Sequence, residues 1–409
     1  MSAPVPRVVR STARFFVRMP LTLGIALVYV AARVITTGMF AVAAQLSTQT
    51  SRFGENATIG DFILGWDAQW YWYIADYGYP TELPLNTAGQ VKQNSWAFLP
   101  FYPELANAIG LPFGSWAVGA LIVSLVAGYL CCLVLYRILA PRIGRAAGLW
   151  AVAFMAAGPL GALFQIGYAE ALAMLFLLLG LDAVMRRRYV RLYFLIPLMG
   201  FTRPGVLAFA LMLGCVLVMR WLRRRVDPLG GKEIAHFIAL GALGSIVGFS
   251  WQIIAAVVTG DHSAYLDTEL AWRRDWTRGQ ASGFLPFDGW INGAAIWFRI
   301  WGMPPWLGYV ALAVVVALTA MMLLLSKRVR RLGPEIRFWS ASYLLYLLAV
   351  FFPQSSTLRL LFPLTPLWGA LAVQRSRLFR WIALLIGLGL QWLWIYNMYA
   401  MGSTFWQVP

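Results

Sequence analysis

Apolar runs, most of them about 20 residues long, recur along this 409-residue chain. A helical run of that length matches the hydrocarbon thickness of a bilayer. The chain is 60% hydrophobic and 12% charged, whereas soluble globular proteins are roughly half apolar and a quarter charged. The runs are continuous, which disfavours the short alternating segments of a transmembrane barrel. We therefore expect an all-α polytopic membrane protein with about 11 transmembrane helices.

Eleven predicted spans are separated by polar or proline-containing stretches. They cover roughly residues 21–45, 115–136, 146–164, 168–185, 190–201, 204–222, 235–258, 305–325, 336–353, 358–374 and 380–400. The first run is too long for the apolar region of a signal peptide, so we expect it to be retained as a helix. The fifth and sixth runs are short and meet at Thr202-Arg203-Pro204. Proline disfavours a continuous helix there, which predicts a break in the outer half of the membrane.

Basic residues cluster at alternate ends of the predicted spans. The positive-inside rule then places the N-terminus in the cytoplasm and the C-terminus outside. The clusters on the predicted cytoplasmic side are Arg7, Arg10, Arg14 and Arg18; Arg137, Arg142 and Arg145; Arg186, Arg187, Arg188 and Arg191; Arg220, Arg223, Arg224, Arg225 and Lys232; Lys327, Arg328, Arg330, Arg331 and Arg337; and Arg375, Arg377 and Arg380. The net charge of +17 is therefore a topology signal, and we expect no nucleic-acid partner.

We expect one domain over residues 1–409, with two large segments on the external side. The first segment covers residues 46–114 and contains GWDAQWYWYIADYGYP and SWAFLPFYP. The second covers residues 259–304. Both are rich in tryptophan and tyrosine, which favour the membrane–water interface. The first segment is therefore expected to carry helices that lie in the interface.

The sequence lacks the signatures of several other site types. The three cysteines lie inside apolar runs, and the two histidines are isolated. Neither a disulfide framework nor a metal-ligand spacing is present, so we expect metal independence. There is also no glycine-rich nucleotide loop, Walker lysine or GxSxG motif, which argues against a nucleotide-driven cytoplasmic enzyme.

Three acids are candidates for chemistry. Asp67 follows Gly65-Trp66 at the predicted start of an interfacial helix, where a carboxylate either caps the helix or serves as a catalytic or binding group. Asp61 is a competing acid six residues earlier. Glu170 opens a membrane helix in FQIGYAEAL. An acid at membrane depth is costly, so Glu170 either caps its helix or faces protein, a cavity or a cation.

Four arginines lie on the external side, against the positive-inside bias. Arg203 is at the break between two short helices, and Arg359 follows a serine- and threonine-rich stretch. Arg273 and Arg274 lie in the second external segment, where they could pair with Asp267, Glu269 or Asp275. Few acids are near Arg203 and Arg359 in sequence. The guanidinium group suits phosphate oxygens, so these arginines are candidate phosphate ligands.

The residues around Asp67 are candidates for substrate contacts. Gln69 and Tyr71 stand in the same WDAQWY stretch. The indoles of Trp66, Trp70 and Trp96 could stack on sugar rings, or they could serve as anchors at the membrane interface.

Five blocks of this chain, in the same order, resemble the PIG-V-like mannosyltransferases. The stretch from Trp66-Asp67 through Gly78-Tyr79 is similar to that family's WDxxxY…IA…GY motif. The later blocks are SWAFLPFYP, FQIGYAEAL, Thr202-Arg203-Pro204 and RLLFPLTP from Arg359, and together the blocks span residues 66–366. Gln69 stands where eukaryotic members often have histidine.

The resemblance implies a GT-C glycosyltransferase fold and an external active site. It implies a polyprenyl-phosphate sugar as donor, a glycolipid or glycan as acceptor, and Asp67 as the general base of an inverting transfer. We expect mannose as the sugar, the donor phosphate to be bound by Arg203 and Arg359, and Arg273 or Arg274 to assist.

Two other functions are compatible with the same residues. Broken helices and charges at membrane depth also occur in transporters, so a lipid or glycolipid flippase is one alternative. A non-catalytic subunit of a glycan assembly complex is another. Arginine far outnumbers lysine, which hints at a bacterial plasma membrane.

Overall fold

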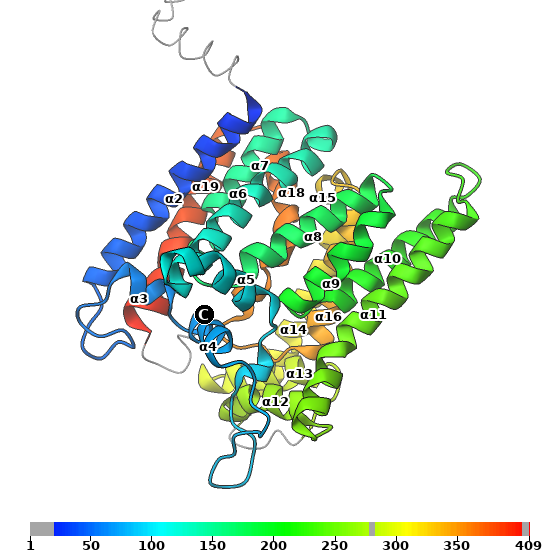
Figure 1. The fold of residues 1–409 in the computed structure, drawn as a ribbon. Helices are drawn as coiled ribbons and strands as arrows, with labels where there is room; N and C mark the ends of the chain where they lie inside the picture. The colour runs from blue at the N-terminus through cyan, green and yellow to red at the C-terminus, as the bar shows by residue number, and fades with distance from the viewer. Residues whose placement is uncertain (1–19, 278–282, 403–408) are drawn as a thin grey trace, which may run out of the picture.

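The computed structural model describes residues 20–277, 283–402 and 409, of which all but a few loops are helical (Figure 1). Within these residues, the one β-like feature is an isolated bridge between Leu85 and Val91. The expected all-α architecture is confirmed. The basic N-terminal segment with Arg7, Arg10, Arg14 and Arg18 lies outside the described residues.

Five helices of the described part are long and apolar enough to cross a membrane, and shorter apolar helices accompany them. The long ones are α2 (Leu21–Gln45), α6 (Trp116–Ile143), α11 (Gly231–Thr259), α14 (Pro305–Leu325) and α19 (Arg377–Ile395), which a π-turn extends to Met401. The shorter ones are α7 (Arg145–Ala157), α8 (Glu170–Met185), α9 (Leu192–Thr202), α10 (Val206–Leu222) and α16 (Pro334–Val350). The chain is an integral membrane protein.

Two predicted spans differ from the helices observed. The third, residues 146–164, is helical only to the end of α7 at Ala157 and continues as a turn and a 3-10 segment (Gly161–Phe164). The tenth, residues 358–374, is broken. It consists of α17 (Thr357–Leu360), a 3-10 segment (Phe362–Leu367) and α18 (Trp368–Ala372). Pro363 and Pro366 lie in the 3-10 segment. Proline lacks an amide donor and disfavours continuation of an α-helix, which explains the interruption.

Helix α6 is central to the packing, with α5 (Phe101–Gly110), α7 and α8 against it. Small residues allow these close contacts. A Cβ at Gly119 would lie 2.0 Å from the Ala106 carbonyl oxygen of α5, so only glycine fits there. Close backbone approach through small residues is how membrane helices associate without a hydrophobic driving force between them.

The predicted break between the fifth and sixth spans is present. Helix α9 ends at Thr202, Arg203 is extended, and Gly205 has a φ of 131°. That φ lies in the region that favours glycine. Helix α10 then packs against α11 and α16.

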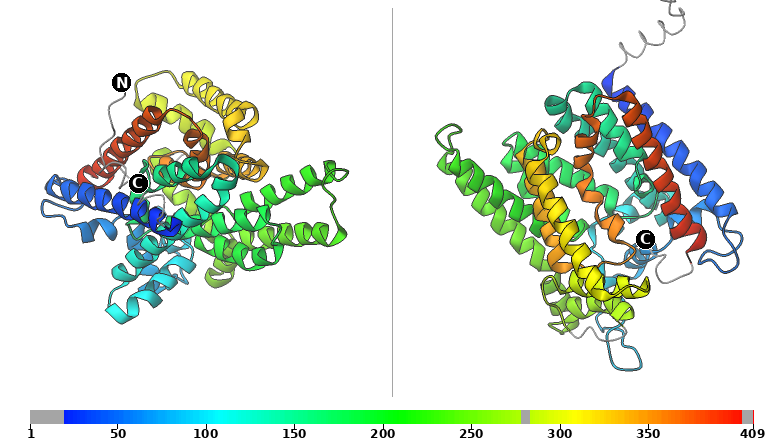
Figure 2. Two further views of the ribbon diagram at one scale, coloured as in Figure 1. Left: turned by 90° about the horizontal axis from the view of Figure 1, so that it is seen from above. Right: turned by 180° about the vertical axis from the view of Figure 1, so that it is seen from behind.

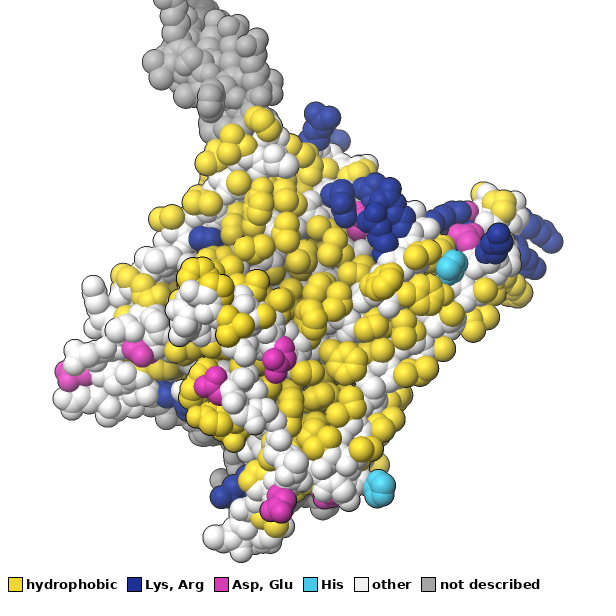
Figure 3. Space-filling view, viewed as in Figure 1, with side chains coloured by type: hydrophobic (Ala, Val, Ile, Leu, Met, Phe, Trp, Pro, Cys, Tyr) yellow, Lys and Arg dark blue, Asp and Glu magenta, His cyan; other side chains and the backbone are white. Residues whose placement is uncertain are grey.

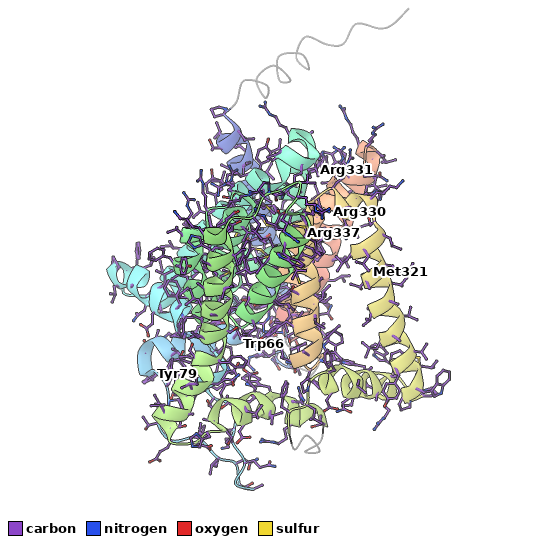
Figure 4. The ribbon with its side chains drawn as sticks, turned by 90° about the vertical axis from the view of Figure 1, so that its right-hand side faces the viewer. Trp66, Tyr79, Met321, Arg330, Arg331 and Arg337 are labelled. Atoms are coloured by element: carbon purple, nitrogen blue, oxygen red, sulfur yellow. The ribbon has the colours of Figure 1, made fainter. Side chains whose placement is uncertain are left out.

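The cations gather at one end of the bundle. Figure 3 shows Lys and Arg side chains over the turns that join α6 to α7, α8 to α9 and α10 to α11, with most visible acids toward the other end. In Figure 4, Arg330, Arg331 and Arg337 lie at the same end, and Trp66 and Tyr79 lie at the opposite end. At this end, Arg220 at the end of α10 forms ion pairs with Glu233 at the start of α11 (2.7 Å) and with Asp227 in the turn between them (3.3 Å).

The end opposite the cations is covered by short helices from the two predicted external segments. The first contributes α3 (Ile59–Ile63), α4 (Asp67–Tyr77) and α5, and the second contributes α12 (Ala264–Thr277) and α13 (Asp288–Ile300) (Figure 1). The expectation of short helices in the first segment is therefore met.

Two further views show how the outer helices are arranged (Figure 2). Helices α2 and α19 run side by side, so the first and the last long helix of the described chain pack against each other. Helix α14, with Met321 labelled in Figure 4, stands at the edge of the bundle and exposes most of its apolar surface.

Candidate active site

Four charged side chains from four separate elements meet at the end of the bundle opposite the clustered cations. Asp67 opens α4, Glu170 opens α8, Arg203 follows α9 and Arg359 lies in α17. Arg359 Nη1 lies 2.5 Å from Asp67 Oδ2, and Arg359 Nε lies 3.3 Å from Glu170 Oε1. Arg203 forms an ion pair with the same Glu170 oxygen. The structure therefore brings together four residues that the sequence places up to 292 positions apart.

The ion pairs run in the order Asp67, Arg359, Glu170 and Arg203, so acids and bases alternate. Two carboxylates balance the charge of two guanidinium groups. Glu170 and Arg359 are almost fully buried, with side-chain exposures of 3% and 8%. Charges so deep in the protein are costly unless they are paired. Asp67 is more accessible, at 16%. A substrate therefore reaches Asp67 more readily than it reaches Glu170.

Tyrosines support the cluster from within the bundle. The Arg359 guanidinium lies over the ring of Tyr168, 5.1 Å from its centroid, in a cation–π contact. Tyr71, expected to contact substrate, is buried and packs edge-on against Phe98 and Tyr102. Its ring is therefore part of the wall behind the site.

The residue before Asp67 has an unusual backbone conformation. Trp66 has a φ of 56° and a ψ of −121°, which is rare for a residue with a bulky side chain. Its indole Nε1 donates to the Met398 carbonyl oxygen at 2.8 Å, and the Arg52 guanidinium lies 4.4 Å from the ring centroid. These two contacts hold Trp66, and with it the start of α4.

The other candidate residues of the WDAQWY stretch take different positions. Gln69 is exposed, and its Oε1 accepts from Arg52 Nη2 at 2.9 Å. Trp70 stacks on Phe98 with ring centroids 5.8 Å apart and meets Trp272 of α12 edge-on. Trp70 therefore joins the first predicted external segment to the second.

Trp96 is buried in a small hydrophobic cluster with Leu99 and Trp251. It is 1% exposed, its Nε1 donates to the Pro80 carbonyl oxygen, and its ring packs between Tyr79 and Trp251. No face of this indole is open to a sugar. Its burial does not fit an anchor at the membrane–water interface either, and Trp96 is a packing residue of the protein interior.

Asp61 acts as a helix-capping residue. Its Oδ2 accepts from the Thr58 amide at 2.8 Å and from the Thr58 hydroxyl at 2.7 Å, while the Thr58 side chain accepts from the Asp61 amide. This reciprocal arrangement is a capping box. Asp67, by contrast, is held by Arg359.

Arg273 and Arg274 are neighbours on α12 with different surroundings. Arg274 Nη1 donates to the Val91 carbonyl oxygen at 2.9 Å. Arg273 is buried, and its guanidinium lies 5.5 Å from the centroid of the Phe352 ring. Burial lowers the pKa of Arg273, partly opposed by Asp288 and Glu269.

In the part of the chain that the structure describes, no group of three or more His, Cys, Asp and Glu side chains could hold a metal ion. The charged cluster has two carboxylates, each of which faces a guanidinium. A carboxylate in such an arrangement can accept a proton, and guanidinium groups can bind an anion.

Four residues that support the site were not predicted from the sequence. Arg52 and Met398 hold Trp66 from distant parts of the chain, and only the tertiary fold brings them there. Tyr168 stands two residues before Glu170, so its place beside the acid could have been suspected from the helix-start motif. Tyr399 is fully buried and stacks on Phe53 in the same region.

No protein-family model matches the chain, and no curated protein matches it in sequence. Among solved structures, the chain is similar to ArnT from Cupriavidus metallidurans bound to undecaprenyl phosphate, with 16% identity and a TM-score of 0.49 over 93% of this chain. It is also similar to the Archaeoglobus fulgidus oligosaccharyltransferase in complex with zinc and sulfate, with 13% identity and a TM-score of 0.44 over 90% of this chain. The chain spans 65% and 52% of the lengths of those two proteins.

Proposed function

We propose that this protein is an integral-membrane glycosyltransferase of the GT-C type. It moves a sugar from a polyprenyl-phosphate donor to a hydroxyl of a glycolipid or glycan acceptor. The observation that carries the proposal is the ion pair between Asp67 and Arg359, backed by Glu170 and Arg203. It unites an accessible carboxylate with two cations, and these are the groups that such a transfer needs.

The reaction is a single displacement at the anomeric carbon. Asp67 takes the proton of the acceptor hydroxyl as its oxygen forms the new glycosidic bond. The bond between the anomeric carbon and the phosphate oxygen breaks, and the polyprenyl phosphate leaves with the electron pair. Attack opposite the leaving group inverts the configuration. Arg359 and Arg203 stabilise the charge that grows on the phosphate.

The Asp67–Arg359 ion pair couples donor binding to the activation of the base. The guanidinium of Arg359 is shared between Asp67 and Glu170. A donor phosphate that binds Arg359 competes with Asp67 for its N–H groups. Loss of that hydrogen bond frees Asp67 Oδ2 to accept the proton of the acceptor hydroxyl. The carboxylate is thereby activated when a donor is present.

The expected orientation places this site outside the cytoplasm. The cations over the turns of the bundle lie at the other end from Trp66 (Figures 3 and 4), which under the positive-inside rule supports an external Asp67. A lipid-linked donor suits that side, where nucleotide sugars are not normally available. The arginine-rich composition favours a bacterial plasma membrane.

Mannose is the sugar we propose, because the five sequence blocks resemble PIG-V-like mannosyltransferases. Four of those blocks supply the charged cluster, with Asp67, Glu170, Arg203 and Arg359 one from each. Their meeting at one point supports a shared role for the blocks.

The test is transfer by the purified protein from synthetic polyprenyl-phosphate sugars, with mannose and glucose compared and glycolipid acceptors offered. We expect transfer of mannose, inversion of the anomeric configuration, and the same rate after chelation of metals with EDTA. Transfer of another sugar would keep the enzyme class and discard mannose. Lipid movement across a vesicle bilayer without transfer would favour the flippase. Neither transfer nor lipid movement would favour a non-catalytic subunit.

A further inference from the structure

Arg33 is a buried cation that the proposed reaction does not use. It lies near the middle of α2, and the residue is only 6% exposed. Among the residues that the structure describes, no carboxylate forms an ion pair with it. A cation inside a membrane helix is costly, so its position requires partners that the fold provides.

The partners of Arg33 are oxygen atoms at the end of α7, the helix that packs beside α2. Nη2 donates to the Ala156 carbonyl oxygen, and Nη1 donates to the Gly161 carbonyl oxygen at 2.6 Å. Nη1 also donates to Gln165 Oε1 at 3.2 Å. The last carbonyl groups of a helix have no partner within the helix, and its C-terminus favours a cation. Arg33 therefore caps α7 from a neighbouring helix and holds the turn that follows.

The segment that Arg33 holds leads directly to the charged cluster. Residues 158–169 join α7 to α8, which begins at Glu170. The Gly167 amide donates to the carbonyl oxygen of Ile63 at 3.0 Å, and a Cβ at Gly167 would lie 2.9 Å from that oxygen. Ile63 ends α3, four residues before Asp67. The segment therefore touches the chain just before Asp67 and ends at Glu170.

A second set of contacts connects Arg33 with the element that carries Arg359. The Arg33 guanidinium lies 5.5 Å from the centroid of the Phe164 ring. That ring packs edge-on against Phe362, with ring centroids 5.3 Å apart. Both rings are buried, and Phe362 stands three residues after Arg359. Residues 158–169 are thus packed against both sides of the ion pair between Glu170 and Arg359.

We propose that Arg33 is a positioning residue for the charged cluster and that it acts through Glu170. It fixes residues 158–169, and these place the Glu170 carboxylate against Arg359 and Arg203. Without Arg33, the carbonyl groups at the end of α7 lose a buried donor, and the segment shifts. The inference rests on the proposed function, because a displaced Glu170 leaves the two arginines badly placed for the donor phosphate.

The experiment is a double-mutant cycle between Arg33→Met and Glu170→Gln in the full-length protein. It measures sugar transfer from polyprenyl-phosphoryl mannose. Arg33→Met alone should slow transfer by about tenfold or more, since a shift of about 1 Å at a reacting centre can cost on the order of 100-fold. In the presence of Glu170→Gln, it should slow transfer by less than about threefold. Residues that act independently would give losses that multiply.

Thermal unfolding of the same four proteins gives a second readout that needs no substrate. Glu170→Gln should lower the unfolding temperature less in Arg33→Met than in the unaltered protein, because Glu170 is then already displaced from its arginines. Arg33→Lys keeps the cation and a donor for the carbonyl groups, so it should lose less transfer than Arg33→Met. If Arg33→Met does not fold, the cycle is run with Arg33→Lys.

Arg220→Met is the matched control. Arg220 is equally buried, at 5%, and binds Glu233 and the Pro228 carbonyl oxygen at the other end of the bundle. Its replacement should lower the unfolding temperature. Its effects on transfer and on unfolding should be independent of Glu170→Gln, because distant sites with no shared partner act additively.

Transfer losses that multiply for Arg33→Met and Glu170→Gln would overturn the proposal. Coupling of Arg220→Met to Glu170→Gln as strong as that of Arg33→Met would also overturn it. If no sugar is transferred, the unfolding cycle decides: coupled shifts keep the positioning role while the transferase function fails, and additive shifts refute the positioning role. If transfer occurs but the two changes act independently, the function stands and the positioning role fails.

Discussion

Glu170 is the residue whose replacement best reveals how the charged cluster is held together. Its carboxylate is 3% exposed and contacts two guanidiniums, those of Arg203 and Arg359. Glu170→Gln keeps the size of the side chain and removes its charge. Arg359 would keep its ion pair with Asp67, and Arg203 would lose its ion pair with Glu170.

The expected cost follows from burial. Breaking a buried ion pair by removing one partner destabilises a protein by about 3–5 kcal/mol, because it leaves a buried charge without compensation. For a protein of moderate size this lowers the unfolding temperature by on the order of 10 °C. Thermal unfolding of purified protein in one detergent would measure it. Sugar transfer should fall by on the order of 100-fold, since the mutual repulsion of the arginines displaces the phosphate-binding groups.

Glu335 provides the control. It forms an ion pair with Arg142 at 3.0 Å, and its side chain is 16% exposed. The pair lies outside the charged cluster and is more accessible. Glu335→Gln should cost about 1 kcal/mol and leave transfer unchanged. Equal stability of the two variants, or an unfolding temperature of Glu170→Gln close to that of the unaltered protein, would refute this account of the cluster.

Three other changes test separate parts of the structure. Trp66→Phe removes the hydrogen bond to the Met398 carbonyl oxygen, so we expect kcat to fall several-fold at constant donor KM; a change in KM alone would contradict a positioning role. Gly119→Val places side-chain atoms against the Ala106 carbonyl oxygen of α5 and should lower the yield of folded protein in size-exclusion chromatography, whereas the open Gly214→Val should not. The raised pKa of Glu269 means that the folded state holds a proton which the unfolded state has lost, so thermal stability should decrease from about pH 4.5 to pH 7; the decrease should be smaller in Glu269→Gln, and an equal decrease would contradict the raised pKa.

The helices could be predicted from sequence because the bilayer imposes a strong physical requirement on them. Long apolar runs such as those of α2 and α14 have one stable outcome in a bilayer, a helix with all backbone groups paired. The break at Thr202-Arg203-Pro204 was equally predictable, because proline limits the local backbone. The broken tenth span was less evident, since its apolar composition masked the effect of Pro363 and Pro366.

The site was predictable only as a set of candidate residues. Asp67, Glu170, Arg203 and Arg359 stood out because a charge at membrane depth needs a reason. Which acid pairs with which arginine depends on tertiary packing, and no local pattern encodes it. The same applies to Asp61, whose capping box with Thr58 is local, and to Trp96, whose role depends on Trp251 far along the chain.

Donor binding and transfer by Asp67→Asn, beside Asp61→Asn, test the central claim most directly. Both variants replace one aspartate with its isosteric amide in the first predicted external segment, and Asp61 is a helix cap. With polyprenyl-phosphoryl mannose and an active acceptor, Asp67→Asn should bind donor and lose nearly all transfer, while Asp61→Asn should retain transfer. Full transfer by Asp67→Asn, or equal losses in the two variants, would show that Asp67 is not the base.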